Sequence, residues 1–77
     1  MDRLAGMGVF VAVADAGSLT KAAQRLGLSA PAVTRSLAAL ELRLGARLFH
    51  RTTRSLRLTE QGQRYLEDCR RILAEVE

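Results

Sequence analysis

Hydrophobic residues recur at helical spacing along most of this 77-residue chain, and glycines divide the pattern into segments. In the first segment, apolar residues lie three and four positions apart, on one face of a helix that ends at Gly17. A short second helix follows, capped by Ser18 or Thr20, and Gly27 ends it because glycine readily adopts a positive φ. The predicted inward residues are Leu4, Met7, Phe10, Val11 and Ala14 in the first helix, and Leu19, Ala22, Ala23 and Leu26 in the second.

A third helix is predicted between Ser29, its cap, and Gly45, its end. Pro31 falls in the first turn, where the missing N–H group costs nothing. At about 100° per residue, one stripe of this helix is apolar and forms core; it contains Val33, Leu37, Leu40 and Leu44. The opposite face presents Pro31, Thr34, Arg35, Ala38 and Leu42, of which Leu42 is alternatively an isolated surface leucine.

The second and third helices have the spacing of a helix-turn-helix. Ala23 is a small residue where the two helices meet, Gly27 is at the bend, and Val33 is an apolar residue that holds the second helix of the pair. Small and apolar residues are common in any helical hairpin. The triple therefore needs support from the rest of the chain.

A short hairpin is predicted after Gly45. Leu48 and Phe49 begin it, residues 51–55 form a polar tip, and the alternation of residues 56–58 is that of a strand. We expect Phe49, Leu56 and Leu58 to face the core and the arginines to face outward. Such a hairpin beside a helix-turn-helix is called a wing.

A last helix is predicted from Thr59, its cap, with Glu60 in the positively polarised first turn. Its apolar residues recur at steps of four, three and four, which is the seam of a coiled coil; they are Tyr65, Cys69, Ile72 and Val76. We expect this seam to pair with a second copy of the chain. Alternatively, it packs on its own domain near Tyr65 and pairs outward beyond Cys69. Because the pattern runs to the final residue, we also expect the chain to be the front piece of a longer protein.

Positive charge is concentrated in the middle of the chain. Residues 21–57 contain eight lysines and arginines against Glu41 alone, a net charge of +7, whereas the remaining residues carry −3. A uniformly solvated surface would not separate charge in this way, so the segment predicts a polyanionic partner. The alternative, a solvated surface with ion pairs, finds no local acid between residues 42 and 59, which hold Arg43, Arg47, Arg51, Arg54 and Arg57.

Other functions lack the residues that they need. Cys69 is the single cysteine, so neither an internal disulfide nor a cysteine zinc site is expected, and a redox role remains a minor alternative. His50 has no second ligand nearby, so no metal or cofactor is expected. With one histidine, no glycine-rich phosphate loop and no nucleophile beside a base, the chain is not predicted to be an enzyme. No apolar run is long enough for a membrane span or a signal peptide, so a cytoplasmic protein is expected.

Several motifs in fixed order resemble the N-terminal domain of LysR-type bacterial transcriptional regulators. The resemblance covers essentially the whole chain and rests on Ala22-Ala23-Gln24-Arg25-Leu26, Leu28-Ser29-Ala30-Pro31-Ala32-Val33-Thr34-Arg35, Leu40-Glu41, Leu44-Gly45-Ala46-Arg47-Leu48-Phe49, Arg51-Thr52-Thr53-Arg54 and Leu58-Thr59-Glu60-Gln61-Gly62. It implies a mainly α fold, a winged helix-turn-helix over residues 1–58, followed by a linker helix over residues 59–77 that dimerises.

The resemblance also implies that the protein binds promoter DNA as a homodimer or higher oligomer, with a small-molecule effector held by a further domain. The DNA-facing positions would be Ser29, Ala30, Pro31, Thr34 and Arg35 on the third helix, and Arg51, Thr52, Thr53 and Arg54 on the wing. Many family members have glutamine in place of Ala30, and only glutamine can form the paired hydrogen bond to adenine. A winged helix used to bind another protein is the alternative function.

Overall fold

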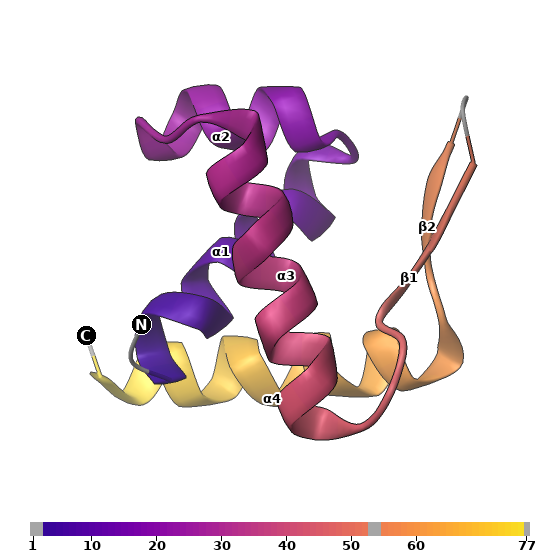
Figure 1. The fold of residues 1–77 in the computed structure, drawn as a ribbon. Helices are drawn as coiled ribbons and strands as arrows, with labels where there is room; N and C mark the ends of the chain where they lie inside the picture. Colours follow the sequence, from indigo (N-terminus) through magenta and orange to yellow (C-terminus); the bar gives the residue numbers. More distant parts are fainter. Residues whose placement is uncertain (1–2, 53–54, 77) are drawn as a thin grey trace.

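The computed structural model describes residues 3–52 and 55–76, which form four helices and one two-stranded antiparallel hairpin (Figure 1). The elements are α1 (Arg3–Ala16), α2 (Leu19–Leu26), α3 (Ala30–Leu44), β1 (Phe49–Arg51), β2 (Leu56–Leu58) and α4 (Glu60–Val76). In Figure 1, α2 crosses one end of α3, α4 crosses the other end, and the hairpin stands beside α3. The predicted winged helix-turn-helix is confirmed.

The helix ends lie where local chemistry predicted them. Ser18 and Ser29 each accept a hydrogen bond from the backbone N–H three residues later, at 3.3 and 3.1 Å. The cap of α2 is thus Ser18 rather than Thr20. Gly27 and Gly45 follow α2 and α3 with φ angles of 69° and 67°, a left-handed conformation that favours glycine.

The core surrounds α1, which packs against all three other helices. Phe10 is fully buried, and its ring centroid lies 5.3 Å from those of Phe49 and Tyr65, in tilted arrangements that favour aromatic contact. The predicted inward face of α1 was too narrow. Val9 and Val13 are also buried, because partners cover α1 from several sides, whereas the predicted core residue Leu4 is 43% exposed.

The core stripe of α3 follows the prediction except at its end. Val33, Leu37 and Leu40 are buried, but Leu44 is 42% exposed. Leu44 is the last residue of α3 and lines a pocket with Met7 of α1 and Tyr65 of α4. Ser36 is buried beside the stripe.

The register of the hairpin decides which way its side chains face. Phe49 pairs with Leu58, His50 with Arg57, and Arg51 with Leu56. Because side chains alternate along a strand, Arg51 shares a face with Phe49, and only Arg57 and His50 occupy the opposite face. Arg51 is nevertheless exposed, as is Arg57, so the structure agrees with the expectation that these arginines are turned to solvent.

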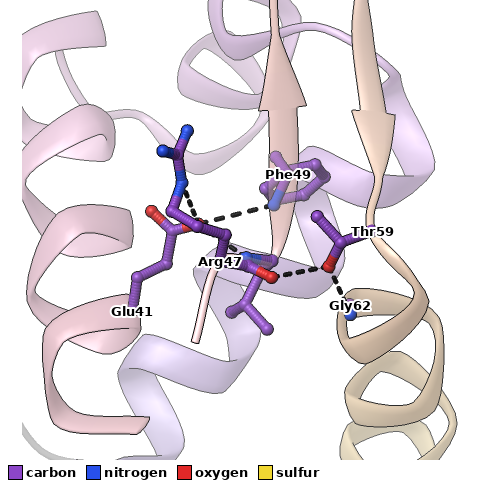
Figure 2. A network of polar contacts seen from close by, with 6 residues as sticks. Glu41, Arg47, Phe49, Thr59 and Gly62 are labelled. Carbon is purple, nitrogen blue, oxygen red and sulfur yellow. Dashed lines mark hydrogen bonds and ion pairs between the residues drawn. The ribbon is translucent and has the colours of Figure 1, made fainter. Parts of the chain in front are cut away.

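The segment between α3 and β1 is held from two sides (Figure 2). On one side, the Glu41 carboxylate on α3 accepts hydrogen bonds from the backbone N–H groups of Leu48 at 2.7 Å and Phe49 at 3.4 Å. On the other side, the Thr59 hydroxyl donates to the Arg47 carbonyl at 2.6 Å, and its oxygen accepts from the Gly62 N–H at 2.9 Å. Thr59 thus caps α4, as predicted, and also fastens α4 to the start of the wing.

Gly62 is the residue at which α4 passes closest to this segment. A Cβ atom placed on Gly62 would lie 2.1 Å from the Leu48 carbonyl oxygen, far inside van der Waals contact. Only glycine allows α4 to begin at this distance from β1. The position of the wing relative to α3 and α4 is therefore set by Glu41, Thr59 and Gly62 together.

Replacing Glu41 with alanine should lower the free energy of unfolding by about 1–3 kcal/mol, because buried backbone N–H groups lose their acceptor. Glu41→Gln should retain most of this stability, since an amide oxygen still accepts a hydrogen bond. Urea unfolding followed by circular dichroism measures both. Glu67→Ala, which removes the same charge from an exposed position of α4, is the control; equal stabilities of the two alanine variants would contradict the bracing role of Glu41.

Candidate nucleic-acid interface

The outer face of α3 is exposed and carries little bulk over its first half. Ala30, Pro31 and Arg35 are exposed, and Thr34 is partly buried. Ser29 is exposed at the helix start, with its oxygen used as the cap. All five predicted recognition positions therefore lie at the start of α3 or directly before it, and Arg35 also lines a pocket with Gly6 of α1.

Such a surface can approach the edges of base pairs closely. A major groove admits one α-helix, and side chains on its exposed face then reach the bases. Thr34 and Arg35 supply a hydroxyl and a guanidinium as hydrogen-bonding groups, whereas Ala30 and Pro31 offer only apolar contact, for example with a thymine methyl group. The helix-turn-helix behind this face is well packed, with Ala23 and Val33 buried and Gly27 in its left-handed turn.

The wing places a second set of predicted residues beside α3. Arg51 is exposed on the hairpin face that looks toward α3. Thr52 is exposed, and its hydroxyl oxygen accepts a hydrogen bond from the Ser55 N–H at 3.0 Å, so it also shapes the turn. The predicted contact residues Thr53 and Arg54 lie outside the described residues.

The arginines of the basic segment take three different places. Arg43 approaches Gly6 and thus lies on the α1 side of α3. Arg57 lies opposite His50 on the outer face of the hairpin. Arg47 and Arg51 line a hollow of about 620 Å³ between α3 and the wing, together with Ala38, Glu41, Leu42, Gly45 and Ala46.

Ion pairs are distributed unevenly between the two halves of the molecule. On α4, Arg64, Arg70 and Arg71 pair with Glu60, Asp15 and Asp68. In the described part of the chain, no ion pair joins Arg35, Arg51 or Arg57 to a carboxylate, and Arg47 is the one member of the basic segment that meets an acid, Glu41. Positive charge on α3 and the wing is therefore left for an external anion.

The seam predicted on α4 is divided between inward and outward positions. Cys69 is fully buried within its own chain, and Tyr65, Ile72 and Leu73 are partly buried. Burial raises the pKa of Tyr65 to about 12 and also raises the pKa of the Cys69 thiol. The burial of Cys69 supports the alternative that this part of the seam packs on its own domain; the Val76 side chain lies outside what the structure describes.

Two features of the site had not been predicted from the sequence. Glu41 was counted only as the single acid of a basic segment, and Arg47 only as one of its charges, yet they meet at 3.8 Å between Arg47 Nε and Glu41 Oε2. The isolation of Glu41 among eight bases was the available signal, since a lone acid in such a segment usually has a specific partner. Glu41 also binds the backbone N–H groups of residues 48 and 49. Residue type does not predict this contact, because every residue except proline has a backbone N–H group.

Residues 3–52 and 55–76 contain no cluster of three or more histidine, cysteine, aspartate or glutamate side chains placed to hold a metal ion. None of the helices within these ranges has the length and hydrophobicity of a membrane span.

Similar proteins fall into one class. Residues 4–63 match the family described as bacterial regulatory helix-turn-helix protein, lysR family. Over 77 residues, the chain is 46% identical to an HTH-type transcriptional repressor of Pseudomonas aeruginosa and 43% identical to the HTH-type transcriptional activator AaeR of Escherichia coli. Both matches cover all of this chain but only 24% and 25% of the relatives. The chain thus spans about a quarter of the length of the curated relatives it matches.

Solved structures show the same arrangement of elements. The CbnR DNA-binding domain in complex with DNA superposes with a TM-score of 0.93 at 43% identity, over 99% of this chain and 86% of that chain. The BenM DNA-binding domain in complex with catB site 1 DNA gives a TM-score of 0.93 at 33% identity, over 99% and 83% of the two chains. Since the family match covers most of its length and the whole described fold agrees with these domains, this chain belongs to the LysR family of bacterial regulatory helix-turn-helix proteins.

Proposed function

We propose that this chain is the N-terminal DNA-binding module of a bacterial LysR-type transcription regulator. The observation that carries the proposal is the exposed, slim face of α3 beside a wing whose described arginines are not neutralised by acids. On double-stranded DNA, α3 lies in the major groove and the wing lies on the adjacent minor groove and backbone. The similarity of this chain to the CbnR and BenM DNA-binding domains, both solved in complex with DNA, supports DNA binding.

Residues divide between reading bases and holding phosphates. Ser29, Ala30, Pro31, Thr34 and Arg35 face the bases and the groove wall at the start of α3. Arg51, Thr52, Thr53 and Arg54 hold the backbone or enter the minor groove from the wing. Phosphate contacts fix the register of a protein on DNA, and contacts to base edges supply sequence preference. Ala23, Gly27 and Val33 keep α2 and α3 at the angle that this requires.

Membership of the family also supports proposals about domain organisation, dimerisation and effector binding. Residues 1–58 bind DNA, and the linker helix of residues 59–77 joins two copies into a dimer, or a higher oligomer in the complete protein. A small-molecule effector binds to a separate domain, and the protein acts in the bacterial cytoplasm, where its DNA target is, without being an enzyme. Within α4, Tyr65, Ile72 and Val76 remain the dimerisation residues.

A role as a protein-binding winged helix has less support. A face of α3 that bound protein would be expected to be apolar, whereas this face carries Thr34 and Arg35 beside an arginine-containing wing. The similar CbnR and BenM DNA-binding domains were solved in complex with DNA.

Selection of bound sequences from a random duplex library tests the function directly. A dimer that reads two major grooves should enrich a pair of related half-sites about one helical turn, or a multiple of it, apart. Sequencing of the enriched duplexes measures this. Failure of the chain to retain any duplex over background would refute DNA binding, and a single site without symmetry would refute the dimeric arrangement.

Replacing Arg51 and Arg54 together with alanine should weaken the salt dependence of binding. Each phosphate contact contributes about −0.9 to the slope of log affinity against log salt concentration, so two lost contacts should reduce the slope by about 2. Fluorescence anisotropy at several salt concentrations gives the slope. Replacing Arg70 and Arg71 on α4 removes the same charge and should leave the slope unchanged; equal slopes for all variants would argue against phosphate binding by the wing.

Replacing Ile72 with aspartate should dissociate the dimer, since burying an unpaired carboxylate in an apolar seam costs several kcal/mol. Analytical ultracentrifugation compares this variant with Ala74→Asp, whose charge lies on the exposed, opposite side of α4. We expect the Ala74 variant to remain dimeric. A dimer that survives Ile72→Asp, with a helical spectrum retained in both variants, would place the interface outside this seam.

A further inference from the structure

The hollow between α3 and the wing is positioned where a DNA strand must pass. Its walls are the second half of α3, with Ala38 and Leu42, and the wing, with Arg51, and Arg47 lies on the connection between them. When α3 occupies a major groove and the wing reaches the next minor groove, the sugar–phosphate strand that separates the two grooves runs between α3 and the wing. The hollow of about 620 Å³ is therefore on the path of that strand.

The charges of the hollow suit a phosphate. Arg47 and Arg51 contribute two guanidinium groups. Glu41 is the single acid among the lining residues, and its side chain is only 12% exposed. Its carboxylate is already bound by the Leu48 and Phe49 N–H groups, so it does not present a free negative charge to the hollow.

Arg47 lies beside the Glu41 carboxylate and is largely exposed. Its Nε atom lies 3.8 Å from the Glu41 carboxylate, while 69% of the side chain remains exposed. Figure 2 shows that the two terminal nitrogens of Arg47 point away from Glu41. The terminal N–H groups of this guanidinium are therefore available to an outside acceptor, and the planar fork of arginine matches phosphate oxygens.

Leu42 gives the hollow an apolar wall. It is 85% exposed and lies four residues after exposed Ala38, on the same face of α3. Because Leu42 is so exposed, it contributes little to the core of the fold. Covering its apolar surface with another apolar group would be favourable. The carbon atoms of a deoxyribose provide the apolar surface that would cover it, next to the phosphate bound by the arginines.

We propose that the hollow between α3 and the wing binds one DNA strand, with Arg47, which lies beside Glu41, as a phosphate ligand and Leu42 as a contact for deoxyribose. The inference rests on the proposed DNA-binding function and adds to it two contact residues, Arg47 and Leu42, outside the tip of the wing and the start of α3. Arg51 binds the same strand from the opposite wall.

The first experiment measures binding to the duplex obtained by library selection, at several salt concentrations. Arg47→Ala should reduce the salt slope by about 0.9, the contribution of one phosphate. The matched control is Arg71→Ala, because Arg71 is 68% exposed and also pairs with one carboxylate, but lies on α4. A slope unchanged by Arg47→Ala would overturn the proposal while leaving DNA binding itself intact; a wild-type chain that binds no duplex would instead refute the function on which the proposal rests.

The second experiment locates the phosphate. Duplexes with one neutral methylphosphonate at each position in turn are bound to the wild type and to Arg47→Ala. At one phosphate, on the strand between the major and minor grooves, neutralisation should weaken wild-type binding but have no further effect on the variant. If the loss of affinity caused by Arg47→Ala and the loss caused by the methylphosphonate add at every position, Arg47 contacts no phosphate and the proposal is wrong.

The third experiment tests the apolar wall with a pair of variants that differ only in charge. Leu42→Glu should bind DNA about tenfold more weakly than Leu42→Gln, because its carboxylate would face the phosphate at close range. Both variants should keep the wild-type melting temperature, since Leu42 is exposed. Equal affinities of these variants would show that no phosphate lies near Leu42 and would contradict the proposal that a DNA strand binds in the hollow.

Discussion

The arrangement of the binding surface depends on the short segment that joins α3 to the wing. Backbone groups of residues 47–49 are bound by Glu41 from α3 and by Thr59 from the start of α4, at distances between 2.6 and 3.4 Å. Gly62 lets α4 approach to a distance that no other residue would permit. Because hydrogen bonds are directional and these groups are largely shielded from water, the wing is fixed to both helices rather than hanging from a loose loop.

This fixation matters because the two parts of the binding surface must fit one rigid ligand. A duplex presents its major groove, its strand and its minor groove at set distances, so α3 and the wing have to be held at a matching separation. The aromatic contacts of Phe10 with Phe49 and Tyr65 serve the same end from the interior, since they join α1, β1 and α4. The packing of the core thus helps to fix the position of the wing relative to the helices.

The distribution of charge agrees with this division of the molecule. Arginines on α4 are paired with acids from α1 and α4, which limits the positive field on that side. Arginines on α3 and the wing meet few acids, and the one carboxylate among them, Glu41, binds backbone N–H groups and lies 3.8 Å from Arg47. Similar domains occur in a repressor and in an activator, so domains this alike serve regulators of opposite effect.

The sequence by itself determined the helices, their ends, the hairpin and the family, because these depend on near neighbours. Ser18, Ser29 and Thr59 cap through the N–H three residues later, and glycines end helices through their own φ angles; both are local properties that residue type reveals. The tertiary structure alone decided the burial of Val9, Val13 and Cys69 and the exposure of Leu44. It also decided that Glu41 binds the backbone of residues 48 and 49 while Thr59 binds the Arg47 carbonyl. Such contacts join segments that meet only in the folded structure, where α1 packs against the other helices. Residue type cannot predict them, because the backbone N–H and C=O groups involved are common to nearly all residues.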